Sequence, residues 1–255
     1  MVIENIKNGE SEDNARPSPN PIQKQSTSEN FWLNLGLNFI IPSLILMKGG
    51  QWFNLQPSSA LIIALFFPLS YGISDFIFRR KYNFLSILGF ISILLTGGIG
   101  LLKIDKDWIA IKEAAIPSII GLAILISLKT PYPLVRTLIY NENIINIATV
   151  EWEIKVRNNL QSFTRLLYNI TVLLAFSFLL SAILNFTLAK ILINSESGTE
   201  AFNEEIGRMT LLSYPIIVVP CTVITLIAFW KILSGLKKLS GLNLDEILRI
   251  SLEEK

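Results

Sequence analysis

Two adjacent ionisable residues, Lys112 and Glu113, lie inside a long apolar run of the sequence at 108–128. A charge surrounded by hydrocarbon is costly, so an ionisable residue in such a run is a candidate for binding a solute or carrying a proton. On a helix the two side chains project about 100° apart, so they cannot both face lipid. We therefore expect partner side chains that neutralise this pair.

The partners that the sequence offers are Glu204, Glu205 and Arg208, at the start of the last apolar run. We expect a buried network across two helices, with Glu113 paired to Arg208 and Lys112 paired to Glu205. Such a network has two possible roles. It either fixes the packing of the helices or couples proton movement to transport. The sequence leaves both roles open, because structural ion-pair networks and functional sites both shift the pKa values of their charged groups.

A second charged pair, Asp75 and Arg79, lies near the end of another apolar run. Residues four apart share a helix face and can form an ion pair. We expect this pair to anchor the end of the helix, and a proton or ion site is the alternative.

Glycine and proline residues occur near the middle of several apolar runs and predict breaks in the helices. Broken helices line the central sites of many transporters, although glycine and proline are also common in membrane helices generally. The predicted breaks lie at Pro42, Pro68, Gly97, Gly98, Pro117, Pro215 and Pro220.

The composition excludes several classes of chemistry. The chain has no histidine, so a histidine-based triad, an HExxH zinc site and an imidazole proton relay are excluded. The single cysteine, Cys221, cannot form an intramolecular disulfide. A net charge of +2 is too small to indicate nucleic-acid binding. We expect no enzyme activity, no cofactor and no metal site.

The elements that must position these residues are six long apolar runs. A bilayer core about 30 Å thick requires about 20 apolar residues in a helix, and backbone groups in lipid must be satisfied within the helix itself. The sequence therefore predicts an all-α polytopic membrane helix bundle with six transmembrane helices. Their expected ranges are 31–47, 58–78, 84–102, 108–128, 170–193 and 209–232.

The distribution of lysine and arginine predicts the orientation of this membrane domain, residues 31–233. Basic residues gather in the segments around 79–81 and 129–165 and near both ends of the chain, and are sparse in the other connections. By the positive-inside rule both termini are cytoplasmic. We expect residues 1–30 to form a disordered cytoplasmic tail and residues 234–255 a cytoplasmic amphipathic segment.

One or two further helices are expected at the cytoplasmic membrane surface. Within an amphipathic insert at 134–168, residues 149–167 predict a helix with Thr149 as N-cap. One apolar face would hold Val156, Leu160, Phe163 and Leu167, and headgroups would meet Lys155, Arg157 and Arg165. The alternative is a helix packed on the floor of the bundle. A shorter amphipathic helix is expected after Asn243.

The stretch 83–140 contains a Gly-Gly span, a short acidic turn, Trp-Ile-Ala-Ile-Lys and a span that leads to Pro-Leu-Val-Arg. It resembles the intracellular septation protein A group of bacterial inner-membrane proteins. Residues 31–242, with the segment SGTEAFNEEIGRMTLLSYP, are similar to a related six-span family that is often labelled as a transporter.

The resemblance implies an inner-membrane protein that serves envelope integrity or division, with the lipid bilayer and other envelope or division membrane proteins as partners. The long tail and the insert at 141–168 depart from the septation group. The alternative function is a small secondary transporter or lipid-handling carrier that uses the charged network. The sequence does not predict an oligomeric state.

Overall fold

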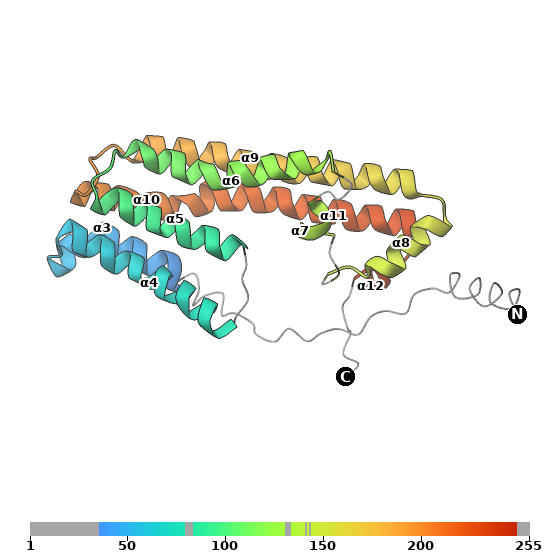
Figure 1. Ribbon diagram of the computed structural model, residues 1–255, viewed down its shortest axis with the longest axis horizontal. Helices are drawn as coiled ribbons and strands as arrows, with labels where there is room; N and C mark the ends of the chain where they lie inside the picture. The colour runs from blue at the N-terminus through green and yellow to red at the C-terminus, as the bar shows by residue number, and fades with distance from the viewer. Residues whose placement is uncertain (1–35, 80–83, 131–133, 141, 143, 249–255) are drawn as a thin grey trace, which may run out of the picture. The chain divides into compact units, whose positions relative to one another are not determined.

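The computed structural model describes residues 36–79, 84–130, 134–140, 142 and 144–248. The expected tail 1–30, the start of the first apolar run and the last seven residues lie outside this part. The elements, with π-helices written η, are η1 (Gly36–Ile40), α3 (Ile41–Phe53), α4 (Pro57–Arg79), α5 (Phe84–Leu101), α6 (Asp107–Ser127), α7 (Val135–Leu138), α8 (Ile147–Val156), α9 (Leu160–Leu192), α10 (Glu200–Ser213), η2 (Tyr214–Val218), α11 (Val219–Ser240) and α12 (Leu244–Ile247) (Figure 1).

The predicted all-helical fold is confirmed for the described residues, which contain no β-strand beyond an isolated bridge between Ile145 and Leu248. Three helices are long and apolar enough to cross a membrane, namely α6, α9 and the continuous helix Glu200–Ser240 formed by α10, η2 and α11. Shorter apolar helices occur at Pro57–Ser70 and Ile91–Leu101.

These three long helices bury little of their apolar surface within the protein. Only 28% of the most apolar stretch of α6 is buried, and the shares are 33% for α9 and 17% for the helix Glu200–Ser240. A helix of a water-soluble bundle buries its apolar stripe and exposes a polar face. The exposed faces of these helices are themselves apolar, which suits contact with lipid.

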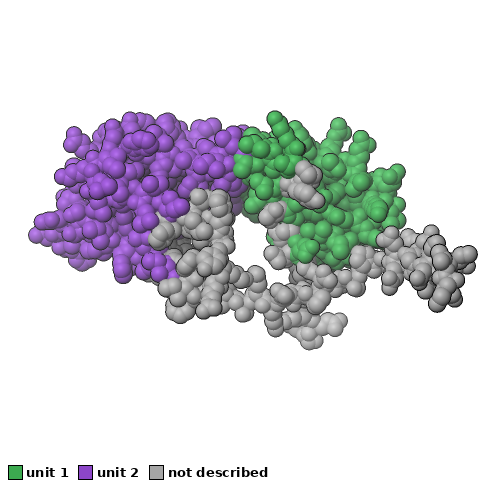
Figure 2. Space-filling model, viewed as in Figure 1, with its two compact units in different colours: residues 1–25, 123–174, 225–255 green, residues 26–122, 175–224 purple. Residues whose placement is uncertain are grey.

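The described residues form two compact units, coloured separately in Figure 2. Unit 2 comprises residues 26–122 and 175–224, and in it α3 packs along α10 and against α4, while α4 packs against α5. Its core includes Leu61, Ala64, Ile109 and Phe202, all almost fully buried. Gly207 permits the close approach of α10 to α3, because a Cβ there would lie 2.8 Å from the carbonyl oxygen of Ser43.

Unit 1 contains residues 123–174 and 225–255. The short helices α8 and α12 pack together in it, and the bridge between Ile145 and Leu248 joins the segments beside them. Its fully buried side chains include Tyr140, Ile154 and Phe163.

The single helix expected over 149–167 is wrong, because the structure has two helices there. α8 ends at Val156, and α9 begins at Leu160 and continues for 33 residues into the fifth apolar run. Asn158, in the link between them, has a φ of 57°, a left-handed conformation that a helix interior does not adopt. Asn146 rather than Thr149 precedes α8, and its side chain makes no capping bond.

The four residues expected on one face of that helix are consequently divided. Val156 and Leu160 are exposed, at 62% and 59%, whereas Phe163 and Leu167 are buried. A helix begins after Asn243 as expected, although α12 is only four residues long, and Asn243 and Glu246 form a capping box at its start.

Most of the predicted helix breaks are not breaks. α4 runs through Pro68, α6 runs through Pro117, and α5 is continuous across its glycine pair, Gly97 and Gly98. Pro220 lies within α11. The helical geometry changes instead at the two π-helices. Pro215 lies within η2, and Pro42 is the second residue of α3, the helix that follows η1. The rings of Phe39 and Tyr214, one from each π-helix, meet edge to face at 5.1 Å.

Candidate functional site

The charged pair predicted in α6, Lys112 and Glu113, forms a polar cluster in unit 2 whose members contact one another and α5. The side chain of Lys112 is only 6% exposed, and its Nζ lies 2.6 Å from Oε1 of Glu113. The same nitrogen donates hydrogen bonds to Oγ1 of Thr96 at 2.7 Å and to Oγ of Ser92 at 3.2 Å, both on α5. An ammonium group has three donors, and these three oxygens can accept one each. The charge of Lys112 is therefore satisfied between α5 and α6.

The expected pairing with α10 is wrong. Among the described residues Glu113 pairs with its neighbour Lys112, and Arg208 pairs with Glu204 one turn earlier at 2.6 Å. The pair on α10 is largely exposed, with 58% of the Arg208 side chain accessible. The physical reason is the rotation of the helices: Lys112 reaches Glu113 and the hydroxyl groups of α5. On α10, Glu205 reaches the loop that precedes the helix, and Arg208 reaches Glu204.

Glu205 forms a separate site at that loop. Its Oε2 accepts hydrogen bonds from the backbone N–H groups of Asn194 and Ser195, both at 2.9 Å, and its Oε1 accepts one from Oγ of Ser195 at 2.8 Å. Hydrogen bonds from N–H groups to a carboxylate are stronger than those between neutral groups. Glu205 thus fixes the chain where α9 ends.

The connection from α9 to α10 is held in several further ways. Gly198 has a φ of +84°, and Thr199 caps α10 by accepting a hydrogen bond from the N–H of Phe202 at 3.1 Å. The side-chain amide of Asn203 donates to the carbonyl oxygen of Pro57 at 2.7 Å and so ties α10 to α4. The motif SGTEAFNEEIG is therefore an architectural segment in which most polar residues have a structural partner.

Charged side chains also join α6 to α9. Nζ of Lys190 lies 2.7 Å from Oδ2 of Asp107, and Lys106 donates a hydrogen bond to the carbonyl oxygen of Asn194. These two contacts join the start of α6 to the end of α9.

Asp75 and Arg79 lie on α4, as expected, but their side chains fall outside the described residues. The predicted ion pair between them stays a prediction.

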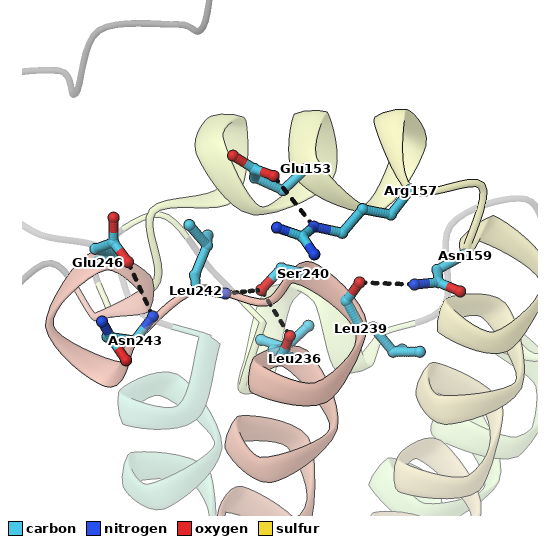
Figure 3. A network of polar contacts seen from close by, with 9 residues as sticks. All are labelled: Glu153, Arg157, Asn159, Leu236, Leu239, Ser240, Leu242, Asn243 and Glu246. Atoms are coloured by element: carbon cyan, nitrogen blue, oxygen red, sulfur yellow. Dashed lines mark hydrogen bonds and ion pairs between the residues drawn. The ribbon is translucent and has the colours of Figure 1, made fainter.

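A second polar arrangement occurs in unit 1, where α8 and the start of α9 meet the end of α11 (Figure 3). Arg157 pairs with Glu153 at 3.3 Å, and its guanidinium lies against Gly241, where a Cβ would be 2.6 Å from Cζ of the arginine. Asn159 donates to the carbonyl oxygen of Leu239 at 2.8 Å. The link between α8 and α9 is thereby fastened to the last turn of α11.

A buried tyrosine lies beneath α8. Tyr140 is fully buried, its ring meets that of Phe163 at 5.4 Å, and its hydroxyl group has no hydrogen-bond partner in the described structure. Burial raises the pKa of Tyr140 far above its ordinary value, and the negative charge of Glu151 adds to the increase. Glu151 itself pairs with Arg136 at 3.3 Å.

Sequence reasoning missed the hydroxyl partners of Lys112. Ser92 and Thr96 are four residues apart and so share a face of α5, which was a usable signal. The loop partners of Glu205 had no such signal, because they are backbone groups whose direction depends on the loop conformation.

No group of three or more potential metal ligands from cysteine, aspartate and glutamate lies together in the part of the chain that the structure describes. Comparison of the chain with family models, with curated proteins and with solved structures finds no match.

Proposed function

We propose that this chain is a multi-pass protein of the bacterial inner membrane that crosses the bilayer six times and serves cell-envelope maintenance or division without catalysing a reaction. The observation that supports a membrane protein is the small buried share of α6, α9 and the helix Glu200–Ser240. Exposing that much apolar helix to water would be unfavourable at about 25 cal/mol for each square ångström. The envelope role follows the septation protein A resemblance of residues 83–140.

The closed cluster around Lys112 favours an architectural role for the buried charges. Each donor of the ammonium group has an acceptor within α5 and α6, so the group needs no external ligand. A cluster of this kind fixes the register of two membrane helices, because sliding either helix would take the hydroxyl acceptors of α5 away from a buried ammonium group. The protein would then act as a scaffold for partners or lipids.

The membrane topology is tested by cysteine accessibility in a Cys221→Ser background. We expect Ser18→Cys and Ser251→Cys to react with an impermeant maleimide only after the inner membrane is opened, and Glu196→Cys to react in intact spheroplasts. Alkaline carbonate should leave the protein in the membrane pellet. Release into the supernatant, or labelling of either terminus from outside, would contradict the proposal.

The envelope role is tested by depleting the protein from its host cells. We expect longer cells or increased sensitivity to detergent, restored by the wild-type chain. Normal morphology and normal detergent resistance after full depletion would exclude this role.

A second candidate function is a small proton-coupled or lipid-handling carrier. The observation that favours it is the contrast within the pair: the side chain of Glu113 is 25% exposed while that of Lys112 is buried, so the carboxylate is the accessible member. In proteoliposomes, Glu113→Gln would abolish proton-coupled flux, and the surface variant Glu204→Gln would not. Flux that is absent from the wild type, or unchanged in Glu113→Gln, excludes this carrier.

A further inference from the structure

The junction of α8, α9 and α11 in unit 1 gathers exposed cations around two exposed apolar side chains. Lys155 and Arg157 flank Val156, and Leu160 follows at the start of α9. Lys237 and Lys238 lie in the last turn of α11. We name these six residues the junction patch: Lys155, Val156, Arg157, Leu160, Lys237 and Lys238.

The contacts of Gly241 and Asn159 bring the two parts of the patch together. Gly241 follows α11 and its N–H donates to the carbonyl oxygen of Lys237 at 3.0 Å, while the guanidinium of Arg157 lies against Gly241 itself. Asn159 bonds to Leu239. The C-terminal end of α8 therefore lies beside the last turn of α11 (Figure 3). That turn also carries Lys237 and Lys238.

The charges of the patch are largely available to an external group. Lys155, Lys237 and Lys238 are exposed and make no ion pair with another residue that the structure describes. Glu153 pairs with Arg157, whose side chain stays 50% exposed. A negatively charged group at this junction would find four cations, of which Arg157 alone is paired with an acid, Glu153, among the described residues.

The patch also contains two exposed apolar side chains, Val156 and Leu160. α8 already buries Thr149, Val150 and Ile154 within unit 1, so its packed face is occupied. Val156 and Leu160 point away from that core and are more than half exposed. Exposed aliphatic side chains between lysine and arginine are typical of segments that enter the headgroup region of an anionic membrane.

We propose that the junction patch binds anionic phospholipid headgroups of the adjoining leaflet, with Val156 and Leu160 entering the acyl boundary. The proposal rests on the proposed membrane function, which places this surface at the cytoplasmic leaflet. Anionic lipid attracts basic residues close to the membrane surface, and a zwitterionic lipid lacks the net charge for this attraction. The patch therefore selects phosphatidylglycerol over phosphatidylcholine.

The test uses the full chain purified in detergent and offered an equimolar mixture of phosphatidylglycerol and phosphatidylcholine, with bound lipids counted by native mass spectrometry. We expect the wild type to retain about tenfold more phosphatidylglycerol. Lys155→Gln/Lys237→Gln/Lys238→Gln should retain the two lipids about equally, whereas the arginine variant of the same three positions should keep the preference.

The matched control removes three charges from unit 2, at Lys48, Lys103 and Arg208, and should leave the preference unchanged. The proposal is overturned if the junction variant keeps the wild-type preference, as it would if an acidic protein segment were the occupant. An equal loss in the control variant would also overturn it. Failure of the proposed function is distinct, because carbonate would then release the protein from the membrane whatever its lipid preference.

Discussion

The side-chain amide of Asn203 donates a hydrogen bond of 2.7 Å to the carbonyl oxygen of Pro57, which lies 146 residues earlier in the chain. This contact joins α10 to the first residue of α4, and Asn203 is almost fully buried. Asn203→Ala should lower the free energy of unfolding by about 1 kcal/mol through loss of that bond.

Asn203→Asp should cost more, at least about 3 kcal/mol at neutral pH, because it buries a carboxylate against a carbonyl oxygen. Burial raises the pKa of the new carboxyl group above its unfolded value, so the loss should shrink as the pH falls and the acid gains a donor proton. Melting in detergent at pH 5 and pH 8 measures this. A variant no less stable at pH 8 than at pH 5 would show that the site is open to water.

Replacing only one member of the ion pair Lys112–Glu113 in α6 should destabilise the protein more than replacing both members. Lys112→Met leaves Glu113 without its cation, and we expect a loss of about 3 kcal/mol. Lys112→Met/Glu113→Gln removes both charges and should recover at least half of that loss. Unfolding in graded detergent mixtures provides the comparison. A double variant less stable than Lys112→Met would mean that Glu113 has another essential partner.

Glu205 and Glu204 are adjacent acids that offer a matched comparison. Glu205→Ala leaves the N–H groups of Asn194 and Ser195 unpaired and should lower stability by about 2 kcal/mol. Glu204→Ala removes an exposed i, i+4 pair with Arg208 and should cost at most about 0.5 kcal/mol. Thermal melting of the two variants, made in parallel, decides the point, and equal losses would argue against the role of Glu205 at the end of α9.

Replacing glycine by alanine at two positions within helices should change the stability of the protein in opposite directions. Gly207→Ala places a Cβ 2.8 Å from the carbonyl oxygen of Ser43 and should separate α3 from α10, at a cost of about 1–3 kcal/mol. A Cβ at Gly98 meets nothing within 4 Å, so Gly98→Ala should stabilise α5 by about 0.5–1 kcal/mol. Melting temperatures that move in the same direction would contradict the tight packing of α3 on α10.

Tyr140→Phe should leave the protein as stable at neutral pH or more stable, because the buried hydroxyl group has no partner among the described residues. The raised pKa of Tyr140 means that the unfolded chain loses this proton near pH 10 while the folded chain keeps it. The folded state therefore loses relative stability as the pH rises above 10.

Tyr140→Phe removes this dependence, so the difference in melting temperature between variant and wild type should widen between pH 9 and pH 11. A constant difference over that range would show that the hydroxyl group ionises as readily in the folded protein as in the unfolded one.

The positions of α4, α5 and α6 could be predicted from the sequence because each coincides with a long apolar run. α9 and the helix Glu200–Ser240 instead begin well before the expected spans at 170–193 and 209–232. The runs at 58–78, 84–102 and 108–128 correspond to Pro57–Arg79, Phe84–Leu101 and Asp107–Ser127. Length and polarity decide whether such a segment is a helix, and both are visible in the sequence. The short α12 was predictable for a similar local reason, since Asn243 and Glu246 form its cap.

The partners of the charged residues could not be predicted, because they depend on how each helix is rotated about its axis. Lys112 selects hydroxyl groups of α5 instead of a carboxylate of α10, and Glu205 binds backbone groups of a loop. The division between α8 and α9 was missed for another reason. The apolar spacing continues across Asn158, and only its left-handed backbone ends the helix.

The π-helix η2 places one residue more in the last long helix than an α-helix of equal rise would hold. Each side chain that follows is turned by about 100° around the axis, the angle that one residue occupies. Cys221 faces Ser177 in this setting, and each accepts a hydrogen bond at its carbonyl oxygen from the other. A single-residue deletion within 214–218 would therefore preserve composition and hydropathy almost unchanged and yet present a different set of side chains to α9, so length is constrained here more strictly than identity.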